Sequence, residues 1–321
     1  LTTDVCGVPH QFGWGGLHGA PDQPIHRKGL LLHVDVTSFY PSIMIHYDML
    51  SRNVKDKSVY KKIYDTRVAL KKAGKKAEQA PYKIILNSTY GICKDPTSAA
   101  YDPRQANNVC VNGQLLLLDL LEHLEAYCEV IQSNTDGLII QIADTDESFD
   151  KVDDVCFEWE TRTGMQLGFD VITEIWQKDV NNYLFKFENG KIERKGAYVK
   201  PLNNLDNDLP IINEALVSYM VKGVPIEKTI GDCKHLKEFQ KIVKISSKYI
   251  CGWHNNRKLD DKTFRVFASK DQHDTFIGKV KMKNGSEAIE KFANTPDHCF
   301  IYNDDVNGVK VPEKLDRSYY I

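Results

Sequence analysis

Two stretches of strand-forming residues, each carrying an aspartate at its end, organise the chain. Residues 30–34 (LLLHV) form a short apolar run that ends at Asp35, which predicts a buried strand with a carboxylate at its end. The stretch 129–142 contains two β-rich runs around residues 134–137, which predicts a hairpin with Asp136 on its turn. If these strands are neighbours in one sheet, the two aspartates lie side by side.

Helical periodicity predicts the elements around these strands. Pro41 ends the first extended run and suits the first turn of a helix, so Asp35 and Tyr40 would face one cavity. The break AGKKAEQAP separates the predicted helices at 58–70 and 80–93, so these two helices must run antiparallel. Longer helices are expected over residues 58–70, 80–93, 103–129 and 148–163.

Two features of the later helices are given structural explanations. The acidic stretch DTDE, at residues 144–147, stands directly before a predicted helix, so it is expected to cap that helix and compensate its dipole. The long helix carries an apolar stripe that is expected to be core, made of Val109, Val111, Leu115, Leu118, Leu121 and Leu124.

The predicted helix at 80–93 presents an unusual combination of side chains. Lys83, Asn87 and Tyr90 are four and three residues apart, so they share one face. Gly91 leaves room for a flat group, such as a base pair, to lie against the helix. A solvated lysine and a core tyrosine would be the ordinary explanation of either residue taken alone.

The flanking parts of the chain carry weaker signals. Residues 1–29 are rich in glycine and are expected to form a loop or hairpin, and their glycines suit either a simple turn or a close approach to a ligand. Residues 169–200 contain short β-like runs, with a hairpin turn at 188–191, and Lys195 and Tyr198 fall in the last run (KGAYV). The stretch 202–210 is a candidate boundary.

Lysines recur every three or four residues in the C-terminal part of the chain. On a continuous helix they would form a cationic stripe suited to a phosphate backbone. The segment KIVKI is equally compatible with a strand, and a solvated face is a further alternative. The lysines are Lys234, Lys237, Lys241, Lys244 and Lys248.

Charge is distributed unevenly, although the formal net charge of the 321 residues is only −2. Residues 51–94 contain twelve basic and three acidic residues, whereas residues 131–180 contain twelve acidic and three basic ones. A basic segment suits a polyphosphate or a nucleic acid, and an acidic one near a carboxylate site suits divalent cations. The eight scattered cysteines form no CxxC pair, which favours reduced thiols in a cytosolic protein, and no membrane segment is predicted.

These residues together suggest phosphoryl-transfer chemistry. Two carboxylates beside a pair of Mg²⁺ ions can hold the attacking and leaving oxygens of an in-line displacement. Arg67 and Lys83, on the two antiparallel helices, would neutralise a triphosphate. Asn87 and Tyr90 would shape the pocket for sugar and base.

The chain resembles family B (polymerase α-like) DNA polymerases, particularly those of bacteriophages. DVTSFYPSI (35–43) is similar to motif A of that family, Lys83 with NSTYG (87–91) to motif B, and SNTDG (133–137) to motif C. KGAY (195–198) resembles the Lys/Tyr motif near the primer terminus. The resemblance covers residues 30–200.

The resemblance implies an α+β fold of the right-hand polymerase type. It implies a palm built on an antiparallel sheet, fingers made of two helices, and a C-terminal thumb. The corresponding ranges are an N-terminal loop or hairpin segment at 1–29, palm at 30–50 and 95–202, fingers at 51–94, and thumb at 203–321.

The resemblance also implies roles for individual residues. Asp35 and Asp136 would be the catalytic metal ligands, assisted by the Val36 carbonyl, for two Mg²⁺ ions that Mn²⁺ could replace. Tyr40 would stack under the deoxyribose and exclude a 2′-hydroxyl. The other nucleotide-binding residues would be Arg67, Lys83, Asn87 and Tyr90, and the DNA-binding residues Gly91, Lys195 and Tyr198.

The implied function is template-directed DNA polymerisation, from dNTP to a primer 3′ end. The expected partners are primer–template DNA, dNTPs, and other replication proteins or a separate exonuclease portion. The expected location is the cytoplasm, that of a bacterial host if the protein is phage-encoded. Only 34 residues precede Asp35, so no proofreading exonuclease is expected in this chain.

The chain departs from the family pattern at two positions. Asn134 stands where most relatives have Asp, and Gly196 stands where a second basic residue is common. The alternative is therefore a polymerase-like module, or a fragment of a replication complex, that binds DNA without chemistry. A reverse transcriptase is a third hypothesis, against which NSTYG speaks.

Overall fold

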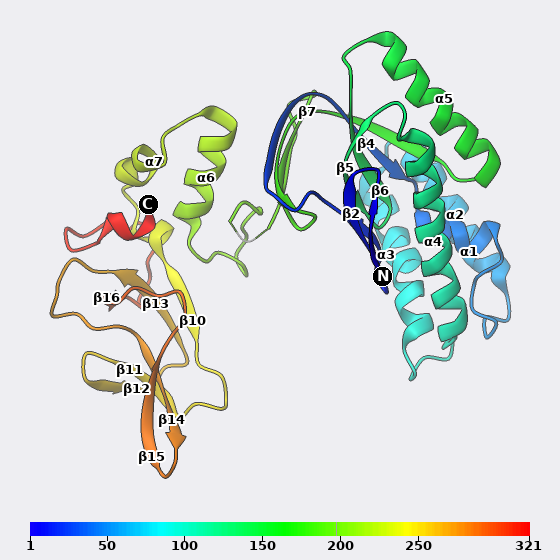
Figure 1. The fold of residues 1–321 in the computed structure, drawn as a ribbon. Coiled ribbons are helices and arrows are strands. Elements are labelled where there is room, and N and C mark those ends of the chain that lie inside the picture. The colour runs from blue at the N-terminus through cyan, green and yellow to red at the C-terminus, as the bar shows by residue number, and fades with distance from the viewer. Residues whose placement is uncertain (197) are drawn as a thin grey trace. The chain divides into compact units, whose positions relative to one another are not determined.

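The computed structural model describes residues 1–196 and 198–321, which form two compact units, Leu1–Glu193 and Arg194–Ile321 (Figure 1). The predicted boundary at residue 203 lies inside the second unit. No helix among the described residues is long and apolar enough to cross a membrane.

A nine-stranded sheet, in the order β1-β2-β3-β5-β6-β4-β7-β8-β9, forms the base of the first unit. Its central strand β4 is antiparallel to both of its neighbours, β6 and β7. The strands are β1 (Thr2–Val5), β2 (Val8–Gly13), β3 (Gly16–Gly19), β4 (Ile25–Val36), β5 (Glu129–Asn134), β6 (Gly137–Ile142), β7 (Leu167–Asp179), β8 (Asn182–Phe187) and β9 (Ile192–Lys195).

The C-terminal part of β4, from Leu31 to Val36, packs on both faces of the sheet, whereas residues 26–29 are exposed. This explains why the sequence from residue 30 is an apolar run rather than an alternating one. Leu32 and Val34 pack with the helices on one face, and Leu31 belongs to a separate cluster on the other face. Burial on two faces removes the polar positions that a half-exposed strand would show. The predicted strand at 30–34 belongs to the C-terminal half of a longer strand, Ile25–Val36.

Residues 1–29 were expected to be a loop or hairpin, and the hairpin alternative is the one observed. Residues 1–19 form three antiparallel strands, and β4 already begins at Ile25. His18 and Gly19 of β3 pair with Asn134 and Ser133 of β5. The N-terminal segment thus joins the sheet beside the hairpin that carries Asp136.

Five helices accompany the sheet, and their ends differ from the predicted ones. The first begins before Pro41, after Ser38 in a left-handed conformation (φ 53°). The third begins at Lys76, so Pro81 lies inside it and the predicted break is shorter than expected. The helices are α1 (Phe39–His46), α2 (Lys57–Lys72), α3 (Lys76–Lys94), α4 (Pro103–Leu124) and α5 (Asp146–Thr163).

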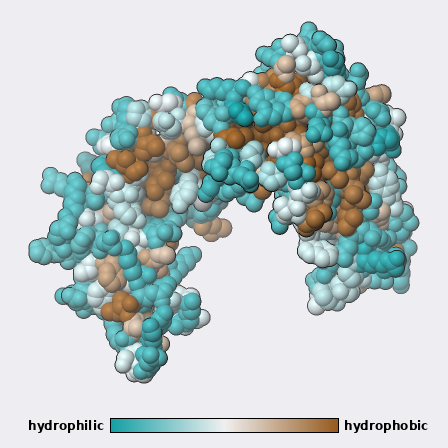
Figure 2. Space-filling view, viewed as in Figure 1, coloured by the Kyte–Doolittle hydropathy of each residue, from teal (hydrophilic) through white to brown (hydrophobic). Residues whose placement is uncertain are grey.

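The predicted apolar stripe of α4 was partly wrong. Val111 and Leu115 are 50% and 54% exposed, and Figure 2 shows hydrophobic side chains at the surface over this helix. The buried face also contains small and polar residues, which a search for large apolar side chains passes over. The buried positions are Ala106, Val109, Cys110, Gly113, Gln114, Leu117, Leu120, Leu121 and Leu124.

The capping role of residues 144–147 is confirmed. Thr145 is the N-cap of α5, and its side chain accepts a hydrogen bond from the Ser148 backbone N–H. Asp146 and Glu147 occupy the first turn, where negative charge is favourable.

Two helices and two small sheets make up the second unit. The cationic-helix hypothesis for Lys234 to Lys248 is wrong and the strand alternative is right, because Lys241 and Lys244 lie in β10. The sheets have the orders β10-β13-β16 and β12-β11-β14-β15. The elements are α6 (Pro210–Lys222), α7 (Ile226–Asp232), β10 (Lys241–Lys244), β11 (Cys251–His254), β12 (Arg257–Leu259), β13 (Thr263–Ala268), β14 (Gly278–Lys283), β15 (Ser286–Lys291) and β16 (Cys299–Ile301), with 3₁₀ turns at Leu236–Phe239 and Arg317–Tyr320.

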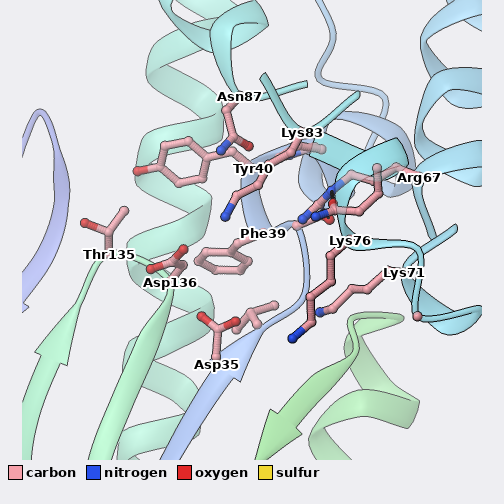
Figure 3. A pocket seen from close by; sticks show the side chains of 15 residues that line it. Asp35, Phe39, Tyr40, Arg67, Lys71, Lys76, Lys83, Asn87, Thr135 and Asp136 are labelled. Carbon is pink, nitrogen blue, oxygen red and sulfur yellow. Dashed lines mark hydrogen bonds between the residues drawn. The ribbon is translucent and has the colours of Figure 1, made fainter. Parts of the chain in front are cut away.

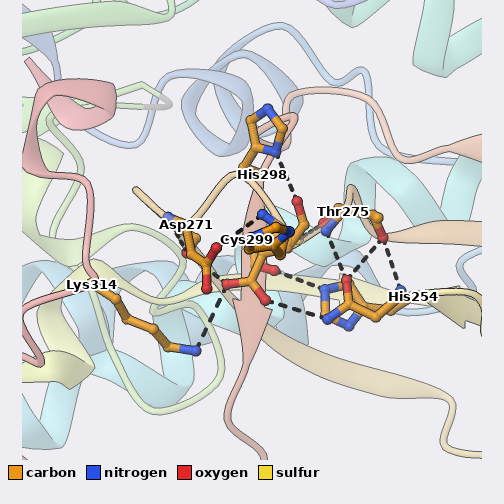
Figure 4. A network of polar contacts seen from close by, with 10 residues as sticks. His254, Asp271, Thr275, His298, Cys299 and Lys314 are labelled. Carbon is orange, nitrogen blue, oxygen red and sulfur yellow. Dashed lines mark hydrogen bonds and ion pairs between the residues drawn. The ribbon is translucent and has the colours of Figure 1, made fainter.

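A polar network joins the two small sheets (Figure 4). His254 Nε2 of β11 lies 2.7 Å from the carbonyl oxygen of Cys299 in β16. Asp274 accepts a 2.6 Å hydrogen bond from Ser269 Oγ and lies 3.7 Å from the Lys314 ammonium. The network therefore has a structural role, because it links the two small sheets of the second unit.

In the first unit, Asp102 fixes the start of α4 to the segment before α2. Its side chain is 3% exposed and accepts 2.8 Å hydrogen bonds from Arg52 Nε and Nη2. It also caps α4 by accepting from the Gln105 N–H. Hydrogen bonding to Arg52 holds the pKa of Asp102 far below its usual range.

We expect Asp102→Ala to lower the free energy of unfolding by about 2 to 4 kcal/mol, because it removes a helix cap and the buried carboxylate of a charge-assisted pair with the more exposed Arg52. Since the folded-state pKa is depressed, this stabilisation is present above the usual aspartate pKa of about 4 and is lost as pH falls below it. Urea unfolding of both proteins from pH 7 down to pH 3 measures this.

Asp65→Ala is the matched control, since Asp65 forms an exposed pair with Lys61. Its expected cost is under about 1 kcal/mol. The role given to Asp102 would be contradicted if both variants lost the same free energy of unfolding. It would also be contradicted if the difference in that free energy between wild type and Asp102→Ala did not become smaller at low pH.

Candidate active site

A cavity of about 630 Å³ lies where the end of β4, the β5–β6 turn and the helices α1, α2 and α3 meet (Figure 3). One carboxylate comes from β4 and the other from the β5–β6 turn, and the cations come from α2 and α3. The lining includes Asp35, Val36, Ser38, Phe39, Tyr40, Arg67, Lys71, Lys76, Gln79, Lys83, Asn87, Thr135 and Asp136.

Strand pairing brings the two predicted carboxylates together. Asp35 of β4 stands opposite Gly137 of β6. The Val36 N–H donates a 2.7 Å hydrogen bond to the Asp136 carbonyl oxygen. Thr135 is left-handed (φ 60°), which makes the turn tight and sets Asp136 at the edge of the cavity.

The electrostatics of this pair are unfavourable without a cation. Burial raises the pKa of Asp35, and the positive charges of Lys71 and Lys83 partly oppose this. Asp136 lines the cavity and is accessible to solvent. Desolvation, followed by repulsion from Asp35, raises the pKa of Asp136 to about 6.

The donor set fits an oxygen-ligated divalent cation. Asp35 and Asp136 supply two carboxylates on one wall, beside Val36. No cluster of three or more His, Cys, Asp or Glu residues that could hold a metal occurs among the described residues. Mg²⁺ is commonly held by one or two carboxylates together with water and substrate phosphates, so this site would need a phosphate-bearing substrate to complete it.

Cations from α2 and α3 face the carboxylates across the cavity (Figure 3). Arg67 is only 7% exposed, and its guanidinium donates to Ser38 Oγ and, over 3.2 Å, to Gln79 Oε1. Lys83 lines the cavity from α3, as the sequence predicted. A buried, hydrogen-bonded guanidinium beside exposed lysines suits a polyphosphate.

Sequence reasoning missed Lys71 and Lys76. Lys71 lies four residues after Arg67, so helical spacing could have found it. Lys76 was assigned to the break between helices, whereas it is the first residue of α3.

Tyr40 packs against neighbouring residues at one end of the cavity. Its ring centroid is 4.8 Å from that of Tyr90, and its hydroxyl donates to the Gly15 carbonyl oxygen over 3.5 Å. A Cβ on Gly113 would lie 3.1 Å from Tyr40 Cε1, so glycine lets the ring pack against α4. Burial raises the pKa of Tyr40, which keeps the phenol neutral.

The other predicted residues lie outside the cavity lining. Tyr90 contacts Tyr40, and Gly91 is exposed on α3 with open space where a Cβ would point. Lys195 ends β9, and Tyr198 is 61% exposed in the second unit. The strand predicted at residues 195–199 (KGAYV) is observed earlier in the sequence, at Ile192–Lys195. Ala197 of that predicted strand lies outside the described part of the chain.

Comparison with known proteins supports a polymerase fold. No family model matches the chain. It is 26% identical over 200 residues to DNA polymerase 1 of Sulfurisphaera ohwakuensis, which covers 60% of this chain and 21% of that protein. Its structure is similar to that of the family B DNA polymerase from the hyperthermophilic archaeon Pyrobaculum calidifontis, with a TM-score of 0.58 and 15% identity.

The structural match covers 93% of this chain and 44% of the Pyrobaculum protein. The mixed α/β fold is therefore that of part of a family B DNA polymerase. The chain matches about a fifth (21%) of the length of the Sulfurisphaera protein. Both similar proteins are archaeal, so the bacteriophage subtype stays a prediction.

Proposed function

We propose that this chain is the nucleotidyl-transfer part of a DNA polymerase, which extends a primer 3′ end from dNTPs with two Mg²⁺ ions. The observation that carries the proposal is the pair of adjacent carboxylates, Asp35 and Asp136, facing a set of helical cations across one cavity. Polymerase-fold similarity over most of the chain supports it.

Each side of the cavity has a separate task in this mechanism. Asp35 and Asp136, with the Val36 carbonyl, would hold the divalent ions, which when bound stabilise the attacking and leaving oxygens of the transfer. Arg67, Lys71 and Lys83 would bind the triphosphate and offset its charge in the transition state.

Tyr40 would set the choice of sugar. Because its ring is fixed by Tyr90 and Gly15, it cannot yield to an extra hydroxyl without breaking those contacts. Asn87, which lines the cavity from α3, would border the base pair. Lys195 and Tyr198 would contact primer–template DNA, and Gly91 would allow close approach to α3.

Primer extension with Asp136→Ala is the central test. We expect the rate to fall by at least about 10³-fold, since the variant loses a ligand for both ions. Asp146→Ala is the control, because Asp146 lies in the first turn of α5 and its extension rate should be unchanged. The reverse pattern would show that the chemistry belongs to the acidic stretch 144–147 and not to Asp136. If the wild type binds DNA but incorporates no nucleotide, the binding-module alternative is favoured.

For the sugar, we expect Tyr40→Ala to raise ribonucleotide incorporation relative to deoxyribonucleotide by about 10- to 100-fold, because the ring no longer blocks a 2′-hydroxyl. Single-nucleotide incorporation with matched dNTP and rNTP measures the ratio. Tyr47→Ala, which removes a tyrosine outside the cavity that donates to the Thr163 carbonyl, is the control. An unchanged ratio in Tyr40→Ala would remove its assigned role.

For the triphosphate, we expect Lys71→Ala to raise the KM for dNTP by about 10-fold or more, because it removes a positive charge that faces the phosphates. Affinity for primer–template DNA should stay the same. Lys72→Ala tests the neighbouring lysine, which does not line the cavity. Equal KM values for the two variants would show that Lys71 does not contact the nucleotide.

A further inference from the structure

Trp14 stands at the tip of the turn between β2 and β3 and is 73% exposed. Trp159, by contrast, is 1% exposed in the core of the same unit. An indole that is largely open to solvent exposes a large apolar area, and tryptophan is enriched among residues that contact a partner.

The backbone under this indole is firmly held. Gln114 Nε2 of α4 donates to the carbonyl oxygens of Gly13, over 2.5 Å, and Gly16, over 3.3 Å. The Tyr90 hydroxyl lies 3.4 Å from the Trp14 carbonyl oxygen. Hydrogen bonds from α3 and α4 thus hold the backbone of the turn on both sides of Trp14, while its side chain stays exposed.

The same turn contacts the proposed catalytic centre directly. The Gly15 carbonyl oxygen accepts from the Tyr40 hydroxyl and, over 3.3 Å, from Thr135 Oγ1, next to Asp136. Gly16 (φ 124°) lies so close to Thr135 that an added Cβ would be 3.0 Å from its methyl carbon. The turn, the sugar-contacting tyrosine and the carboxylate hairpin therefore form one packed unit.

The β2–β3 turn lies at the end of the cavity where the base of a bound nucleotide would be. In Figure 3 Tyr40 and Thr135 lie at one end of the cavity, and Arg67 and Lys71 lie at the other. A nucleotide with its triphosphate on the cations and its sugar on Tyr40 directs its base toward Tyr90 and the turn. The strand that pairs with this base must pass the same end of the cavity.

We propose that the Trp14 indole is a stacking platform for an unpaired base of the single-stranded template, a role that rests on the polymerase function proposed above. Stacking on an aromatic ring is independent of base identity, as a template reader requires. Lys94, whose ammonium lies 4.9 Å from the centre of the Tyr90 ring, adds positive charge beside the turn for the strand's phosphates.

Fluorescence anisotropy with two labelled DNAs tests this without requiring catalysis. One is a duplex with a 5′ single-stranded template overhang, and the other is the same duplex with blunt ends. We expect Trp14→Ala to raise the Kd for the overhang DNA by about 5- to 100-fold, the range of base–aromatic stacking, and to leave the blunt-end Kd within about twofold. Trp14→Phe should retain most of the affinity.

Phe157→Ala is the matched control, because Phe157 is a 69% exposed aromatic residue on α5 of the same unit. It should change neither Kd. Equal Kd values for Trp14→Ala and wild type on the overhang DNA, or an equal loss on both DNAs, would overturn the proposal. Asp136→Ala separates the two hypotheses, since it should abolish extension while leaving the overhang preference and its dependence on Trp14 intact.

Discussion

The pairing of β4 with β6 is the constraint on which the rest of the site depends. It sets Asp35 opposite Gly137 and joins Val36 to the Asp136 backbone by a 2.7 Å hydrogen bond. Two carboxylates held in one partly desolvated cavity repel each other, and the backbone ladder prevents them from separating. Positive charge in the cavity is the physical remedy, and α2 and α3 are placed to supply part of it.

The charge imbalance seen along the chain is mostly not used at the cavity. Of the basic residues in 51–94, only Arg67, Lys71, Lys76 and Lys83 line the cavity, while three other lysines pair with acids at the surface: Lys57 with Asp48, Lys61 with Asp65 and Lys75 with Glu78. In the acidic region, Asp136 lines the cavity, while Asp146 and Glu147 serve the start of α5. A segment's net charge therefore indicates the kind of partner but does not identify the residues that meet it.

The N-terminal segment completes the site from a distance in sequence. Its β2–β3 turn is held by Gln114 of α4 and contacts Tyr40, Tyr90 and Thr135. These contacts order the residues that would surround sugar and base before any substrate arrives. Such preorganisation lowers the cost of fixing them during a reaction.

The sequence alone predicted the strand before Asp35, the hairpin around Asp136, the paired helices with Arg67 and Lys83, and the cap of α5. Each depends on local rules of periodicity, turn chemistry and capping that neighbouring residues satisfy among themselves. Only the tertiary structure decided that β6 lies beside β4, that Lys71 and Lys76 face the carboxylates, and that residues 1–19 form strands beside the hairpin that carries Asp136. Those outcomes depend on contacts between residues far apart in the chain, and burial against another element leaves no periodic signal in a short, glycine-rich or charged segment.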